Sequence, residues 1–415
     1  MVERRFELCG LDGANPLGFL AALGTLVTLH RSGVGTARLW WERSTRWVPI
    51  LEGVPVEREE DDSAKGELAL RIAGALRGRH VAEAAGEERR IAQKAMEDAK
   101  TAIKKKRDEL KRRGLRGTER AEAIELELAP LERDYEEKRR RWLAALRDAV
   151  PRPELALGKR IEDAGSEEYR ELAEAILAGS DGSSRDALDL LAALGSDACV
   201  DRNGRVEATP FEFTAGSGHQ FFLNDVGQLM EKVTPELISN ALFEPWSYRD
   251  EGLSLRWDPV EDRRYALLDR DPTDSKNKPR TVWMANLLGY CGLALFPAAP
   301  AGRRLAASGW SDDGGSQYFT WPLWTHPVSL DVVRSLVQLS ELVRERPNLA
   351  VLAPRGIIAV YRAPRIVVGS AANKKLNFTS ARQIVGFTRP VPAAAPRGPA
   401  GRSQPGAHFE VRAPE

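Results

Sequence analysis

The stretch KTAIKKKRDELKRRGLRGTER, residues 100–120, decides the fold because it contains the one break in a long helical segment. Residues 80–149 are rich in Ala, Glu, Lys, Arg and Leu and lack the apolar–polar alternation of a strand. The break is GLRG, Gly114–Gly117, where glycine lets the chain reverse. The pattern therefore predicts two long helices folded as an antiparallel hairpin. At about 1.5 Å per residue, each arm of about 30 residues should extend roughly 45 Å.

The tip of this predicted hairpin is strongly basic. Residues 100–120 hold ten Lys or Arg against three acids, although the whole chain has a net charge of only +1. One interpretation is a solvated helix face, and the other is contact with a phosphate backbone. Charge-rich helices are more often solvated faces, but KKKR (104–107) and KRRGLR (111–116) support the second interpretation, because neither run contains a compensating Glu. The candidate phosphate-binding residues are Lys104, Lys105, Lys106, Arg107, Lys111, Arg112, Arg113 and Arg116.

The segments on either side of the hairpin mix helix and strand signals. Near the start, Asn15 and Pro16 predict the beginning of a buried helix that ends near Arg31, in which Gly18 and Gly24 allow another backbone to approach closely. We predict an α+β fold, with a mixed core, an inserted long antiparallel helical hairpin and a basic C-terminal β-hairpin region. The expected divisions are 1–79 (N-terminal α/β part of the core), 80–149 (helical hairpin), 150–345 (mixed core), 346–388 (basic β-rich region) and 389–415 (disordered Pro/Ala/Gly/Arg tail).

The C-terminal region is the strongest charge anomaly. Residues 346–409 contain ten Lys or Arg and no Asp or Glu, a one-signed surface typical of proteins that bind a polyanion. GIIAVYRAPRIVVG, residues 356–369, is predicted as a β-hairpin whose turn is flanked by two arginines. The candidate contacts in this region are Arg362, Arg365, Lys374, Lys375 and Arg382.

Motifs for catalysis are missing from the sequence. There is no GxxxxGK[ST], no HExxH and no GxGxxG after a strand, and the five His are scattered. Three distant Cys exclude a disulfide framework and favour a reducing, cytoplasmic setting. We expect no enzyme activity, no metal, no cofactor and no membrane span. The alternative is a metal-dependent nuclease that uses the Asp cluster within 258–274, although interleaved Arg favour ion pairs there.

Two further strings have the chemistry of anion binding. In FTAGSGHQFF, residues 213–222, the glycines suit a nest of backbone N–H groups, while the alternative is a tight loop before a buried helix. Two adjacent Arg beside Tyr265 fit nucleic-acid contact, or simply ion pairs with nearby Asp. The candidate residues are Gly216, Ser217, Gly218, His219, Gln220, Arg263 and Arg264.

Five strings occur in a characteristic order. They are LCGLDGANPLGFLAALGTL, FTAGSGHQFF, LRWDPVEDRRYAL, GLALFPAAPAGRRLAASGW and FTWPLWTHPVSLDVVRSL. In this order the chain resembles the large-subunit family of type I-G (formerly I-U) CRISPR effector complexes, over residues 5–30 and 205–345. The hairpin and the tail lie outside this resemblance.

The resemblance implies a non-catalytic subunit of a Cascade-like, crRNA-guided surveillance complex for antiviral defence. Its expected partners are the crRNA, target double-stranded DNA, the backbone and guide-end subunits of the effector, and a helicase-nuclease that it helps to recruit. It implies roles in inspecting the protospacer-adjacent motif and in stabilising the R-loop. In such complexes guide pairing recognises most of the sequence, while protein recognises a short motif and backbone shape.

A third interpretation is an assembly scaffold built on the helical hairpin. This would require an apolar stripe that a partner helix could pack against. Ile91, Ala95, Ala99 and Ile103 provide only a thin one.

Overall fold

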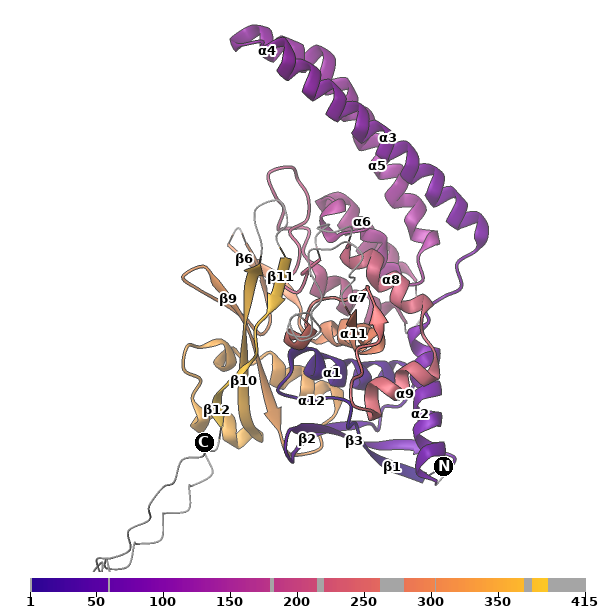
Figure 1. The fold of residues 1–415 in the computed structure, drawn as a ribbon, viewed down its shortest axis with the longest axis vertical. Helices are drawn as coiled ribbons and strands as arrows, with labels where there is room; N and C mark the ends of the chain where they lie inside the picture. The colour runs from indigo at the N-terminus through magenta and orange to yellow at the C-terminus, as the bar shows by residue number, and fades with distance from the viewer. Residues whose placement is uncertain are drawn as a thin grey trace, which may run out of the picture.

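The computed structural model describes residues 2–58, 60–179, 183–214, 220–261, 280–302, 304–368 and 375–386. It is a mixed α+β structure, as predicted, from which a long helical hairpin projects (Figure 1). Within these residues no helix is both long enough and apolar enough to cross a bilayer. The tail, 389–415, lies outside the described residues.

The N-terminal part is a small antiparallel sheet against two helices. Strands β1, β3 and β2 lie side by side in that order. Asn15 caps the helix after β1, since its side chain accepts from the N–H groups of Leu17 and Gly18. A further helix follows β3, begins in the acidic stretch at Asp61 and has several buried Ala and Leu side chains. The elements are β1 (Val2–Glu7), α1 (Pro16–Arg31), β2 (Arg38–Arg43), β3 (Trp47–Val56) and α2 (Asp61–Leu76).

Helix α1 is the centre of the molecule. Every residue from Pro16 to Leu29 is buried, and α1 packs against α11 (Trp283–Gly292). Helix α11 belongs to residues 150–345, called here the third block. The contact is at backbone distance, because a Cβ on Gly24 would lie 1.7 Å from the Leu288 carbonyl oxygen. This close approach confirms the role predicted for Gly24.

Replacing this glycine tests how far the core depends on the close approach. Gly24→Ala forces α1 and α11 apart, so we expect a loss of about 3 kcal/mol in the free energy of unfolding. Gly74→Ala in α2 is the control, because a Cβ there meets nothing within 4 Å and should stabilise the helix by roughly 0.5–1 kcal/mol. Urea unfolding measures both variants. Equal effects at the two positions would contradict this account.

The hairpin follows the prediction closely. Helix α3 (Glu83–Arg113) ends at Gly114, which adopts a left-handed conformation with φ 66°. The return arm comprises α4 (Gly117–Ala123), a π-helical turn (Ile124–Leu128) and α5 (Ala129–Ala149). At about 1.5 Å per residue, α3 is roughly 46 Å long. Apolar contacts between α3 and α5 bury Ala99 and Ile103, whereas Ile91 is 62% exposed, so much of the thin apolar stripe is used within the hairpin itself.

The third block supplies helices around α1 and α11. Two of these helices, α6 and α7, lie within residues 166–194. Its elements are two short 3₁₀ turns (Pro153–Leu157 and Ile161–Asp163), α6 (Ser166–Ala178), α7 (Ser183–Leu194), α8 (Phe222–Glu231), α9 (Pro235–Phe243), β4 (Asp250–Glu251), β5 (Arg280–Thr281) and a 3₁₀ turn (Leu293–Leu295).

A second antiparallel sheet joins the third block to the C-terminal region. Its order is β11-β10-β9-β8, with β12 also paired to β10. Between β9 and β10 the chain passes through short helices and turns. Strands β6 and β7 form a separate two-stranded sheet. The elements of this part of the chain are β6 (Ala298–Ala301), β7 (Arg304–Ala307), β8 (Trp310–Asp313), β9 (Ser316–Trp324), α12 (Leu330–Val337), a 3₁₀ turn (Ser340–Val343), α13 (Leu349–Leu352), a 3₁₀ turn (Ala353–Arg355), β10 (Ile357–Val368), β11 (Lys375–Phe378) and β12 (Arg382–Gly386).

The predicted hairpin within 356–369 is wrong. This segment is the single strand β10, which pairs with β9 from Ile357 to Arg365 and with β11 and β12 on its other edge. The Arg-Ala-Pro-Arg sequence in its middle looked like a turn. Pairing to β9, which is distant in sequence, keeps it extended.

One aromatic core connects all of these parts. The ring of Phe319 on β9 contacts Phe19 of α1, Phe211, Trp321 and Phe378 of β11. All five side chains are at most 3% exposed. Residues 1–79, 150–345 and 346–388 therefore contribute to a single core, and the hairpin projects from it.

Candidate nucleic-acid interface

At the hairpin tip, three of the eight candidate cations are paired. Lys106 and Arg113 both contact Glu127 of the return arm, at 3.3 and 2.6 Å, and Arg107 contacts Glu132 at 2.7 Å. The two cations lower the pKa of the Glu127 carboxyl, mainly through their hydrogen bonds to it. The expectation that these runs lack compensating acids is therefore wrong for these three residues. Glu127 and Glu132 come from the return arm, and Lys106 also pairs with Glu109 of its own helix at 2.9 Å.

The other five candidate cations at the tip have no acidic partner among the residues that the structure describes. All five side chains are exposed, and one of them, Arg112, also donates through Nε to the Asp108 carbonyl oxygen at 3.3 Å. Lys104 and Lys111 lie on the same side of α3, as do Lys105 and Arg112, because seven residues are about two turns. The members of each pair are about 10 Å apart along the helix axis. The set, called here the free tip cations, is Lys104, Lys105, Lys111, Arg112 and Arg116.

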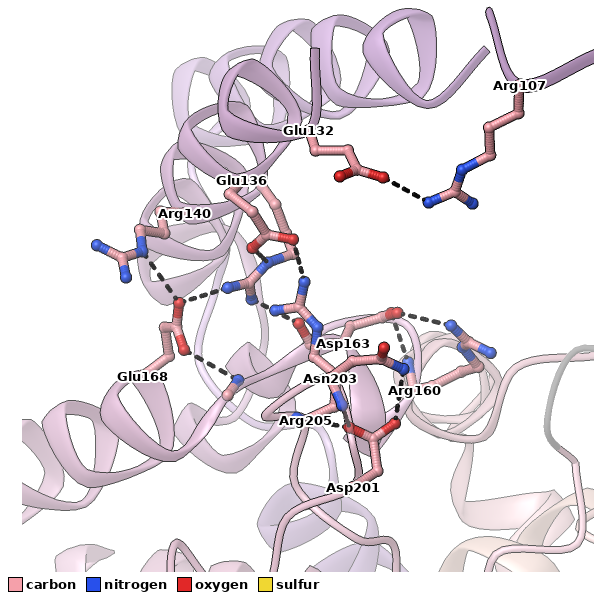
Figure 2. Close-up of polar contacts among 12 residues, drawn as sticks. Arg107, Glu132, Glu136, Arg140, Arg160, Asp163, Glu168, Asp201, Asn203 and Arg205 are labelled. Atoms are coloured by element: carbon pink, nitrogen blue, oxygen red, sulfur yellow. Dashed lines mark hydrogen bonds and ion pairs between the residues drawn. The ribbon is translucent and has the colours of Figure 1, made fainter. Parts of the chain in front are cut away.

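Ion pairs at the other end of the hairpin fasten it to the core (Figure 2). The central residue is Arg139 of α5, whose side chain is only 4% exposed. It donates to Glu168 of α6 at 2.6 Å, to the Asp163 carbonyl oxygen at 2.7 Å and to Glu136 at 2.9 Å. Arg205, from the turn after α7, also contacts Glu136. Since these groups come from three separate segments, the hairpin is held in a defined direction.

The electrostatics of this base depend on Arg139. Burial works to raise the pKa of Glu168, but the charge of Arg139 and hydrogen bonds from Arg139 and from backbone N–H groups outweigh it, so this pKa is lowered. The Gly165 N–H, for example, donates to the Glu168 carboxylate at 2.9 Å. The sequence analysis did not find this network. Its one visible signal was an Arg on the buried face of an amphipathic helix.

Most other candidates from the sequence fall outside the described residues. They are Gly216, Ser217, Gly218, His219, Arg263, Arg264 and Lys374. Lys375 begins β11, but its side chain is also outside them. Arg382 is exposed at the start of β12. Nucleic-acid contact by all of these stays a prediction.

Gln220 lies within the described residues, and its side chain forms hydrogen bonds with Arg256. Its Oε1 accepts from both Nε and Nη2 of Arg256, at 3.2 and 2.7 Å. Arg256 has a φ of 63°, an uncommon conformation for a residue with a side chain, and its Nη1 also reaches Asn377 of β11 at 3.5 Å. Arg256 thus brings together three segments that the sequence treated separately. Nothing in the sequence distinguished it.

Arg362 and Arg365 point their guanidinium groups at the protein itself. Arg362 donates to Thr320 at 2.9 Å and to backbone carbonyl oxygens after α12. Arg365 donates to the Pro210 carbonyl oxygen at 2.9 Å and lies over the rings of Phe213 and Trp310. Burial lowers the pKa of both guanidinium groups. Their place at a hairpin turn was wrong, and the proposal below does not rest on them.

Asp258, the first member of the suggested metal cluster, holds the core together. Its carboxylate accepts from Asn15 at 2.8 Å and from the Tyr248 hydroxyl at 2.7 Å. Within the described part of the chain, no group of three His, Cys, Asp or Glu is placed to hold a metal ion. The other members of the cluster lie outside the described residues, namely Asp262, Asp269, Asp271 and Asp274.

Near Asp258, the buried carboxyl of Glu261 links residues that precede the segment 262–279 to Thr281, which follows it. Glu261 accepts from the hydroxyls of Ser254 and Thr281. Burial, together with the charge of Asp258, raises the pKa of Glu261 to about 8.

A comparison with protein-family models finds no match, and neither does a comparison with curated proteins. The function proposed below therefore rests on the hairpin geometry and on the five ordered strings.

Proposed function

We propose that this protein is a non-catalytic, nucleic-acid-binding subunit that presents the free tip cations to a phosphate backbone. The observation that carries the proposal is their position. They are five exposed cations, without acidic partners among the residues that the structure describes, at the end of a hairpin roughly 46 Å long. A solvated helix face would pair its charges, as Lys106, Arg107 and Arg113 do. The anchored base supports the proposal, because a held arm loses less entropy on binding than a loose one.

Phosphate contact explains why no known DNA-binding motif is needed. Lys and Arg neutralise phosphates whatever the base sequence, and binding then releases counterions. If all five free tip cations contact duplex phosphates, the slope of log affinity against log salt is about −4.5. Affinity should then fall roughly 500-fold between 50 and 200 mM salt.

The resemblance to the type I-G large subunit supports the proposal that this binding occurs within a crRNA-guided effector complex. In that setting the subunit would inspect the protospacer-adjacent motif, hold target DNA as the R-loop forms and help to recruit the helicase-nuclease. Other effector subunits would bind the core and not the tip, because the tip is proposed to contact DNA. This assignment rests on the five quoted strings.

Co-expression with a tagged CRISPR-type RNA and the neighbouring effector subunits tests the assignment. We expect the chain to co-purify with the RNA and the complex to bind target DNA in a salt-steep and motif-dependent way. Absence of the chain from the purified complex would contradict membership of such a complex. A flat salt dependence would contradict phosphate binding by the tip.

A further inference from the structure

A cavity of about 390 Å³ lies where the base of the hairpin meets the core. It is bounded by α3, α5 and α8, which lie together in Figure 1. Its volume is within the range of sites that bind small molecules, about 300–1,000 Å³. Part of its wall is apolar, formed by side chains such as Leu146, Leu155 and Leu223.

The charged groups around this cavity are mostly cationic. Arg77, Arg79, Arg89 and Lys159 line it, and Glu231 is the one acid among the described residues of the lining. Arg77 and Arg79 donate to backbone carbonyl oxygens, which orients them without neutralising their charge. Lys159 pairs with Glu97 at 3.1 Å. The lining therefore keeps an excess of positive charge.

Two buried donors in the lining lack an acceptor. The indole Nε1 of Trp142 has no hydrogen-bond partner within the described residues, and the Trp142 side chain is 2% exposed. The Nε of Arg89 is likewise buried without a partner there, and Arg89 forms no ion pair with a described residue. Buried donors are nearly always paired in folded proteins, because leaving one unpaired is costly. Trp142 and Arg89 both belong to the residues that line this cavity, and we take their unpaired donors as the sign of an acceptor from outside the chain.

We propose that this cavity binds a phosphate-bearing anion, with Trp142 Nε1 and Arg89 donating to the phosphate and the apolar wall covering the group attached to it. A nucleoside monophosphate fits this description better than inorganic phosphate, which would leave the apolar wall uncovered. The phosphate has two sources, a free mononucleotide or the terminal phosphate of a nucleic-acid strand. The inference goes beyond the proposed function, because the cavity is at the opposite end of the hairpin from the free tip cations.

Calorimetric titration of the full chain with adenosine 5′-monophosphate tests the proposal, with adenosine and sodium chloride as controls. We expect saturable binding of the monophosphate alone. Trp142→Phe keeps the ring but removes its N–H, and Arg89→Met keeps the length but removes the charge. Each should weaken binding about tenfold or more, because each removes a hydrogen bond to a charged group. Unchanged thermal melting would show that both variants are folded.

Oligonucleotides with a 5′-phosphate or a 5′-hydroxyl distinguish the two sources. Tighter binding of the 5′-phosphate form, lost in Arg89→Met but kept in Lys111→Gln at the tip, identifies a strand end as the ligand. No preference between these oligonucleotides, together with saturable monophosphate binding, identifies a free nucleotide. The proposal is overturned if the monophosphate does not bind, or binds both cavity variants as tightly as the unaltered protein.

Discussion

Changing Lys104, Lys105 and Arg112 to Glu together is expected to lower the affinity for duplex DNA by roughly 10²–10³-fold near 100 mM salt. The three side chains are exposed and have no acidic partner among the described residues, so each is available to release a counterion on binding. The salt slope should also become shallower by about 2.7. Fluorescence anisotropy with labelled DNA across a salt series measures both quantities.

A control with the same change of charge lies on the same hairpin. Arg90, Lys94 and Arg141 are exposed near the base of α3 and α5, and their reversal to Glu alters the net charge equally. We expect this control to change affinity less than tenfold. If both triple variants lose affinity equally, long-range charge and not contact at the tip explains the binding. If neither does, the tip assignment is wrong.

Replacing Arg139 with Met is expected to lower the free energy of unfolding by about 3–5 kcal/mol at pH 7. The methionine fills much of the same space but leaves Glu168, 14% exposed, with only the longer contact to the exposed Arg140 among the described residues. The cost comes mainly from that poorly compensated carboxylate. Urea unfolding measures it, and hydrogen exchange should show α5 and α6 losing protection together.

The neighbouring residue supplies a matched control. Arg140 also contacts Glu168, at 3.5 Å, but its side chain is 63% exposed and solvent screens its charge. Arg140→Met should therefore cost less than about 1 kcal/mol. Similar losses for the two variants would show that burial of Arg139 is not what makes the base strong.

The unaltered protein and Arg139→Met should respond differently to acid. Because the pKa of Glu168 is lowered in the fold, this group stabilises the unaltered protein above its unfolded pKa, and the contribution is lost as the pH falls through the folded pKa. In Arg139→Met, burial is no longer opposed by the Arg charge, so the pKa should rise and the carboxyl should accept a proton at higher pH. The stability difference between the two proteins should therefore shrink as the pH falls below about 4.3.

The parts of the fold that local sequence predicted correctly depend on local physical chemistry. The hairpin was visible because some 30 helix-favouring residues lie on each side of one Gly-containing break, and Gly114 does adopt the left-handed conformation that ends α3. The cap at Asn15 and the close-packing glycine at 24 were visible for similar reasons. Local signals were weaker at residues 61–65, where charged residues hid the start of α2.

Two features of the candidate sites depend on residues that are far apart in sequence. Arg107 and Arg113 looked uncompensated, because their acids, Glu132 and Glu127, follow on the return arm. The donors of Trp142 and Arg89, which have no partner within the described residues, carry no sequence signal at all, since an unpaired atom is defined by what surrounds it.

The sequence by itself determined the α+β class, the length and place of the hairpin and the excess of cations at its tip, because helix propensity and charge act over a few residues. Only the tertiary structure decided which of those cations stay unpaired, that residues 357–368 form one strand, and that Arg139 anchors the arm. Ion pairing, strand pairing and burial join residues distant in sequence, and only the folded chain brings those residues together.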